Sequence, residues 1–61
     1  MNELDVVKLI KDLDDIPKGT EGTIAHKYDK TNFEAEFFDD KLDTIDVVTT
    51  SAEYLELVKT Y

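Results

Sequence analysis

The residues of this chain that could do chemistry begin with a glycine-containing segment, residues 16–28, with the sequence IPKGTEGTIAHKY. A phosphate-binding loop of the Gly-x-x-x-x-Gly-Lys type needs a lysine directly after its last glycine and a helix behind it. Here Thr23 follows Gly22, Glu21 places a carboxylate beside the supposed anion, and the segment continues as an alternating strand. The sequence therefore predicts a structural turn at this segment rather than an anion-binding site.

Six aspartates in two groups are the candidate metal-binding or acid–base residues: Asp12, Asp14 and Asp15, followed by Asp39, Asp40 and Asp43. Calcium takes roughly six to eight oxygen ligands, and neither group has the spacing of an EF-hand loop. We favour solvated loop charge and assign no metal, with weak calcium or magnesium binding left open. Paired carboxylates act as acid and base only in a cleft that separates their pKa values, and so short a chain offers few clefts. We therefore expect no catalysis and no cofactor.

His26 is the only histidine, Ser51 is the only serine, and the chain has no cysteine. Transition metals therefore lack ligands of the kind they prefer. Nucleophilic catalysis would need a hydroxyl and an orienting acid around the imidazole ring. We predict instead that His26 is a strand residue packed near Tyr28 and Phe33.

Charge is the most pronounced global feature of the sequence. Fifteen acidic residues and seven lysines give a net charge of −8, and arginine is absent. Such a charge repels nucleic acid and anionic membranes at long range, so we expect neither as a partner. Two explanations of the acidity stay open: it serves solubility, or it forms a surface complementary to a basic protein.

The length of the chain, 61 residues, predicts a single domain over residues 1–61 with one thin core. No segment approaches the roughly 20 apolar residues of a membrane span, and the first 30 residues hold no apolar run long enough for a signal peptide. Together with the absence of cysteine, this predicts a cytoplasmic protein. Homo-oligomerisation is left open.

Residues 4–13 are predicted to form a strand, because valine and isoleucine are enriched and the apolar positions partly alternate. A helix over the same residues stays open, since the apolar positions also fit a helical stripe. Residues 16–19 are predicted to form a type I turn, with proline second and glycine fourth. Gly22, before the next strand at residues 23–28, indicates a β-bulge or a close approach of two backbones.

The run FEAEFF, residues 33–38, is the clearest strand of the chain. Its strict alternation places three residues in the core: Phe33, Ala35 and Phe37. The residues between them, Glu34 and Glu36, face water, and Phe38 falls on the same side. Hairpin loops are predicted on both sides of this strand, at residues 29–32 and 39–43.

The next strand is predicted at residues 44–50, with Ile45 and Val47 inside and Thr44 and Asp46 outside. A strand of this pattern would complete a hairpin with residues 33–38.

The C-terminal part begins with a capping-box pattern, in which Thr50 caps a helical turn and Glu53 reaches back to it. This turn, 3₁₀ in character, is predicted to dock Leu55 on the core. Leu57 and Val58 then form a short closing strand. Four or five short strands and one helical turn together predict a small, strongly bent antiparallel barrel.

The sequence resembles a family of short bacterial proteins, the domain of unknown function 4926 family, over nearly the whole chain. The resemblance is carried by these residues: Asp5, Val7, Leu9, Asp12, Lys18, Gly19, Gly22, Thr23, Ile24, Phe33, Glu34, Glu36, Phe37, Thr44 and Leu55. It implies an all-β, Src-homology-3-like antiparallel barrel of four to five strands with a short 3₁₀ or helical turn near the C-terminus. It also implies that members lie beside toxin-like genes, as antitoxin or immunity components.

The predicted hairpin brings acidic residues to one outer face, with two aromatic residues as anchors. The candidate protein-binding residues are Glu34, Glu36, Phe38, Asp39, Asp40, Asp43, Asp46 and Tyr54. We interpret the chain as a non-catalytic interaction module that neutralises a basic, nuclease-like protein through this face, as an antitoxin or immunity protein would. The alternative is a small structural accessory subunit that docks on a larger enzyme by its sheet edge. A merely solvated sheet face also stays open.

Overall fold

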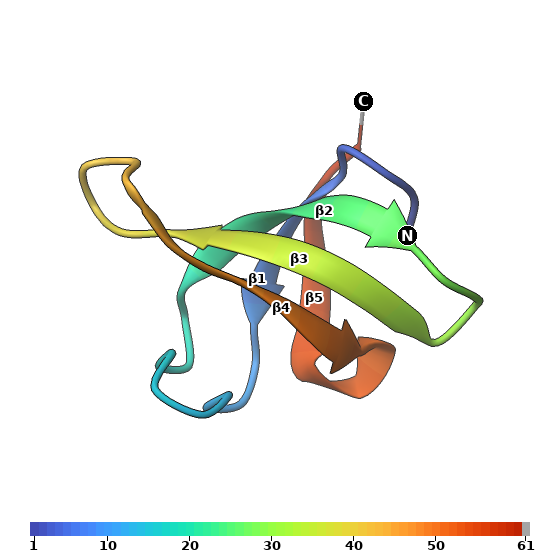
Figure 1. The fold of residues 1–61 in the computed structure, drawn as a ribbon, viewed down its shortest axis with the longest axis horizontal. Coiled ribbons are helices and arrows are strands. Elements are labelled where there is room, and N and C mark those ends of the chain that lie inside the picture. Colours follow the sequence, from blue (N-terminus) through green and yellow to red (C-terminus); the bar gives the residue numbers. More distant parts are fainter. Residues whose placement is uncertain (61) are drawn as a thin grey trace.

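The computed structural model describes residues 1–60, which form one antiparallel sheet of five strands in the order β4-β3-β2-β1-β5 (Figure 1). The elements are β1 (Val6–Leu9), β2 (Glu21–Lys27), β3 (Asn32–Phe38), β4 (Thr44–Ser51), the 3₁₀ turn η1 (Ala52–Tyr54) and β5 (Leu55–Lys59). Figure 1 shows β1 and β5 crossing the other strands steeply, so the sheet is strongly bent. The predicted all-β fold is confirmed; the sheet itself is not closed, and β4 and β5 form its two edges. Tyr61, the last residue of the predicted domain, lies outside the described residues.

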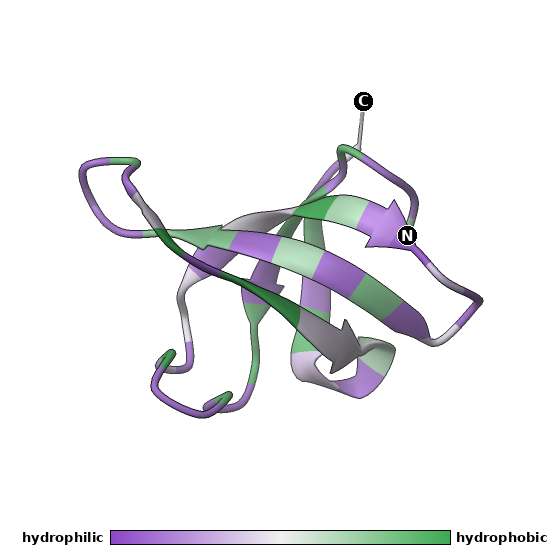
Figure 2. Ribbon diagram, in the orientation of Figure 1, coloured by the Kyte–Doolittle hydropathy of each residue, from purple (hydrophilic) through white to green (hydrophobic). Residues whose placement is uncertain are grey.

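The core follows from alternation along the strands, which Figure 2 shows as alternating hydrophobic and hydrophilic bands on β3. The buried apolar residues are Val7, Leu9, Ile16, Ile24, Phe33, Ala35, Phe37 and Leu55. The strand prediction for the first segment is therefore confirmed over the helical alternative, although β1 is only four residues long. Val48 of β4 packs against this core from one side. Burying these side chains is the main driving force for so small a fold.

The proline turn lies one residue later than predicted. The amide of Thr20 donates a hydrogen bond to the carbonyl of Pro17 at 3.2 Å, so the turn spans residues 17–20. Gly19 is then its third residue, and its φ of +94° gives a type II turn, which needs glycine at that position. Ile16, just before the turn, is buried and exchanges two 2.8 Å backbone hydrogen bonds with Leu13. The loop is thus anchored on the core.

Gly22 marks a close approach of two strands, as the sequence indicates. It lies opposite Phe37 in the β2–β3 ladder. A Cβ atom at this position would lie 2.8 Å from Cδ1 of Phe37 and would collide with the carbonyl oxygen of Glu36. Only glycine allows β2 and β3 to meet at this distance.

The prediction of which β4 side chains point into the core is wrong. Ile45 and Val47, expected in the core, are each 46% exposed. The cause is a β-bulge at the end of the ladder, where the register shifts between Phe37 and Phe38. It makes Asp46, rather than Ile45, the partner of Phe37. Because side chains alternate with a period of two, this one-residue shift exchanges the two faces of the strand.

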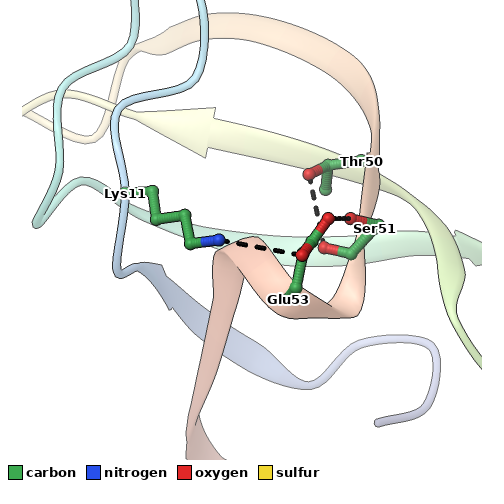
Figure 3. A network of polar contacts seen from close by, with 4 residues as sticks. All are labelled: Lys11, Thr50, Ser51 and Glu53. Carbon is green, nitrogen blue, oxygen red and sulfur yellow. Dashed lines mark hydrogen bonds and ion pairs between the residues drawn. The ribbon is translucent and has the colours of Figure 1, made fainter.

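The predicted capping box is also wrong. The N-cap of η1 is Ser51, and it makes no side-chain capping hydrogen bond to the backbone. The hydroxyl of Ser51 instead donates to Glu53 at 3.3 Å, and Glu53 forms a 3.7 Å ion pair with Lys11 (Figure 3). Thr50 is buried, and its hydroxyl donates to the Ser51 carbonyl at 3.4 Å. Leu55, directly after the turn, docks on the core as predicted.

The β2–β3 loop is organised by Asp29. One of its carboxylate oxygens accepts hydrogen bonds from the amides of Thr31 and Asn32 at 2.8 and 2.9 Å. Hydrogen bonds from the backbone of Thr31 and the side chain of Asn32 hold the pKa of Asp29 below its usual value. These bonds stabilise the ionised carboxylate and with it the hairpin.

We expect the contribution of Asp29 to stability to disappear in acid. Because its pKa is lower in the folded than in the unfolded state, the contribution is complete above the unfolded pKa and is lost as the pH falls through the folded pKa. Urea unfolding between about pH 6 and pH 2 should show the wild-type and Asp29→Ala curves converging towards the acid end. Curves that stay parallel would contradict this role.

Candidate protein-interaction site

The negative charge of the protein is concentrated in one part of the chain. Residues 31–58 contain eight acidic residues and one lysine, Lys41, which gives this part a charge of −7. The rest of the chain contains seven acidic residues and six lysines and so carries only −1. The negative electrostatic field around the protein therefore comes mainly from β3, β4 and the segments that follow them.

An open groove of about 740 Å³ lies between the proline turn, the start of β2 and the β3–β4 loop. Three large apolar side chains line it: Phe38, Leu42 and Ile45. Three carboxylate residues also line it: Glu21, Asp39 and Asp40. The β-bulge of β4 explains the position of Ile45, because it removes that residue from its expected place opposite Phe37. One lysine, Lys18, is also part of the lining, so the groove combines apolar side chains with an excess of negative charge.

Asp39 builds the loop that forms one wall of this groove. Its carboxylate accepts hydrogen bonds from the amides of Lys41 and Asp43 at 2.9 and 3.0 Å. Its own amide donates to the carbonyl of Asp43 at 2.9 Å, and its carbonyl accepts from the amide of Leu42 at 2.9 Å. Asp39 therefore holds the loop in shape, while Asp40 and Asp43 carry the exposed charge.

Leu42 is the most unusual residue of the site. Its side chain is 79% exposed, and its φ of +66° lies in the left-handed region that favours glycine and asparagine. Neither burial nor backbone preference explains a leucine at this position. Strained backbone of this kind is found preferentially at functional sites, where a specific side chain must be presented.

Glu34 and Glu36 lie on the outer face of β3, as predicted, and both are half-buried. Each carboxylate accepts a hydrogen bond: Glu34 from the phenol of Tyr28 at 3.2 Å, and Glu36 from the hydroxyl of Thr44 at 2.6 Å. The hydrogen bond to Glu34 raises the pKa of Tyr28 above its usual value. Both carboxylates therefore already have a hydrogen-bond donor within the protein.

Two predicted site residues are not brought together with the others. Asp46 pairs with Phe37 and so lies on the other side of β4 from the two glutamates, and its carboxylate accepts the amide of Val47 at 2.8 Å. Tyr54 is in η1, at the opposite end of β4 from the β3–β4 loop (Figure 1). There it packs against the core, with the Nζ of Lys11 5.2 Å from the centre of its ring. The predicted single face is in this respect wrong.

His26 lies outside the groove. Its ring meets that of Tyr28 edge-on, with 4.7 Å between the centroids, and its Nδ1 lies 3.2 Å from the carboxylate of Glu3. The predicted contact with Tyr28 is confirmed. The predicted packing near Phe33 is wrong, because His26 lies opposite Glu34 with an exposed side chain, whereas Phe33 is buried in the core. Within residues 1–60, no three histidine, cysteine, aspartate or glutamate side chains are placed to hold a metal ion together. In the same residues, no helix has the length and apolar character needed to cross a membrane.

The fold and the groove together define a small all-β protein with an open five-stranded sheet and one acidic, apolar-lined surface. The chain belongs to the family described as domain of unknown function (DUF4926), whose model matches residues 3–57. The family membership predicted from the sequence is thereby confirmed. Comparison with curated proteins and with solved structures finds no match for this chain.

Proposed function

We propose that this protein is a non-catalytic interaction module that binds and neutralises a basic, nuclease-like protein, in the manner of an antitoxin or immunity protein. The partner would dock on the groove and on the β3–β4 loop. The observation that carries the proposal is Leu42, a strained and exposed apolar residue beside a cluster of carboxylates.

The composition of the groove supports this function. Binding energy in protein interfaces is concentrated in a few large side chains that enter a complementary surface. Phe38, Leu42 and Ile45 supply such side chains, since each is at least partly exposed and all three line one groove. The surrounding carboxylates provide the polar rim that typically encloses an interface core.

The charge supports the choice of a basic partner. A nuclease holds the phosphates of its substrate with lysine and arginine side chains. Asp40 and Asp43, exposed on the β3–β4 loop, present carboxylates that would stand in for those phosphates. The charge of −7 on residues 31–58 would also accelerate the encounter with such a surface.

We expect reversal of the loop charge to slow this association. The Asp40→Lys, Asp43→Lys double variant should bind a basic protein recovered from the native cell extract about tenfold more slowly at low salt, with a weaker dependence on ionic strength. Stopped-flow measurements at two salt concentrations test this. Both residues are exposed, so the fold should tolerate the change.

The matched control is Glu3→Lys, Asp15→Lys, which changes the net charge equally but outside both the groove lining and residues 31–58. It should retain most of the association rate. Equal rates for the wild type and the loop variant would refute the mechanism. They would favour the accessory-subunit alternative, in which docking depends on the sheet edge rather than on charge.

A further inference from the structure

β4 is an unusually open edge of the sheet. It is eight residues long, it has a neighbour on one side only, and it contains neither lysine nor proline, the residues with which proteins commonly protect such edges. The opposite edge, β5, is five residues long, has a register shift in its ladder with β1, and carries Lys59. Of the two edges, β4 is therefore the better template for an additional strand.

The backbone of β4 has hydrogen-bonding groups directed away from the ladder. The amide of Val47 donates to the side chain of Asp46 at 2.8 Å, which marks it as an amide that faces the edge rather than β3. In an antiparallel pair such groups recur at every second residue, so the amide of Thr49 faces the same edge. Ile45 and Val47, each 46% exposed, provide apolar side chains along this strand.

The negative charge near β4 determines which kind of strand can bind at this edge. A second copy of the chain would bring two segments of charge −7 together, which disfavours edge-to-edge dimerisation. A cationic segment would be attracted instead. Asp43 directly precedes β4, Asp46 lies near its start, and the neighbouring strand carries two glutamates, Glu34 and Glu36. The carboxylate of Asp46, which now accepts the amide of Val47, would become available to a lysine or arginine.

We propose that β4 binds an extended segment of the partner, rich in lysine or arginine, as a sixth strand of the sheet. Main-chain hydrogen bonds to the edge amides align the segment with β4, and its alternate side chains lie beside Val47 on one face and Asp46 on the other. This inference rests on the proposed function, because it specifies how the basic partner is held.

A synthetic octapeptide of alternating lysine and valine, with both ends blocked, is the probe. Nuclear magnetic resonance at low salt should show amide hydrogen exchange at Thr49 slowed about tenfold by this peptide. The control peptide has the same sequence with every valine in the D configuration, so that it keeps the charge but cannot lie as a regular strand. It should leave the exchange at Thr49 unchanged.

The peptide should also slow exchange at the other edge amide, that of Val47. The variant Thr49→Pro removes one edge amide without removing a bond of the β3–β4 ladder, and it should abolish the slowing at Val47. The exchange measurement on the wild type does not depend on the folding of this variant. Equal binding of both peptides with unchanged exchange at Thr49 would overturn the sixth strand and leave the charge-based function standing. Binding of neither peptide, together with unaltered association of the loop variant Asp40→Lys, Asp43→Lys, would overturn both.

Discussion

The Gly22→Ala variant is expected to lose about 3 kcal/mol of unfolding free energy, because the added methyl group has no room between β2 and β3. The new Cβ would lie 2.8 Å from Cδ1 of Phe37 and would collide with the carbonyl oxygen of Glu36. A side chain could rotate away, but a carbonyl in the β2–β3 ladder cannot move without breaking its strand pairing. Relief therefore requires the two strands to separate at this point of the ladder.

Urea unfolding monitored by circular dichroism measures this loss, and Gly19→Ala is its control. Gly19 has φ +94° but open space around the position of a Cβ, so its substitution should cost only about 1 kcal/mol of backbone strain. A larger loss at Gly22 than at Gly19 would identify crowding as the cause. Equal losses at the two glycines would contradict the close approach.

Strict alternation is the sequence signal that predicted the fold. Phe33, Ala35 and Phe37 on β3 are buried as expected, because nothing interrupts the period of two along that strand. The strand assignment of β1 was also correct, since its valines are typical of a pleated surface. Local pattern was sufficient for these two strands, although their ladders with neighbouring strands contain register shifts.

The β-bulge is the feature that local pattern could not predict. Without it Ile45 would pair with Phe37, and the predicted facing of β4 would hold. A β-bulge depends on the pairing of two strands, and no residue type in the segment TIDVVTT predicts it. This single shift exposed two apolar residues and separated Asp46 from the predicted acidic face.

The negative charge of the candidate site was predicted, but the apolar side chains that line its groove were not. The acidic loop at residues 39–43 was expected, and it lies on the groove. Leu42 and Ile45 were not among the predicted site residues, because their place in the groove follows from a loop conformation and a strand register. One sequence signal could have indicated Leu42: it is the only apolar residue in the loop DDKLD, where burial is not expected.

Replacing Leu42 with glycine should weaken binding of the basic partner at least about tenfold while making the protein more stable. The stability gain, about 0.5 kcal/mol, follows because glycine adopts φ +66° without the strain that leucine has there. The binding loss follows because a large apolar side chain is removed from the groove. Titration calorimetry and urea unfolding of the same variant measure the two effects.

Leu4→Gly is the control, because it makes the same leucine-to-glycine substitution outside the groove. Leu4 also has a left-handed φ, +74°, and is 67% exposed, but it does not line the groove. Its replacement should raise stability by a similar amount and leave binding unchanged. If both variants weakened binding equally, or if Leu42→Gly left it intact, the strained leucine would have no role in recognition. Opposite effects on stability and binding at Leu42 alone would mean that its conformation is maintained for the partner rather than for the fold.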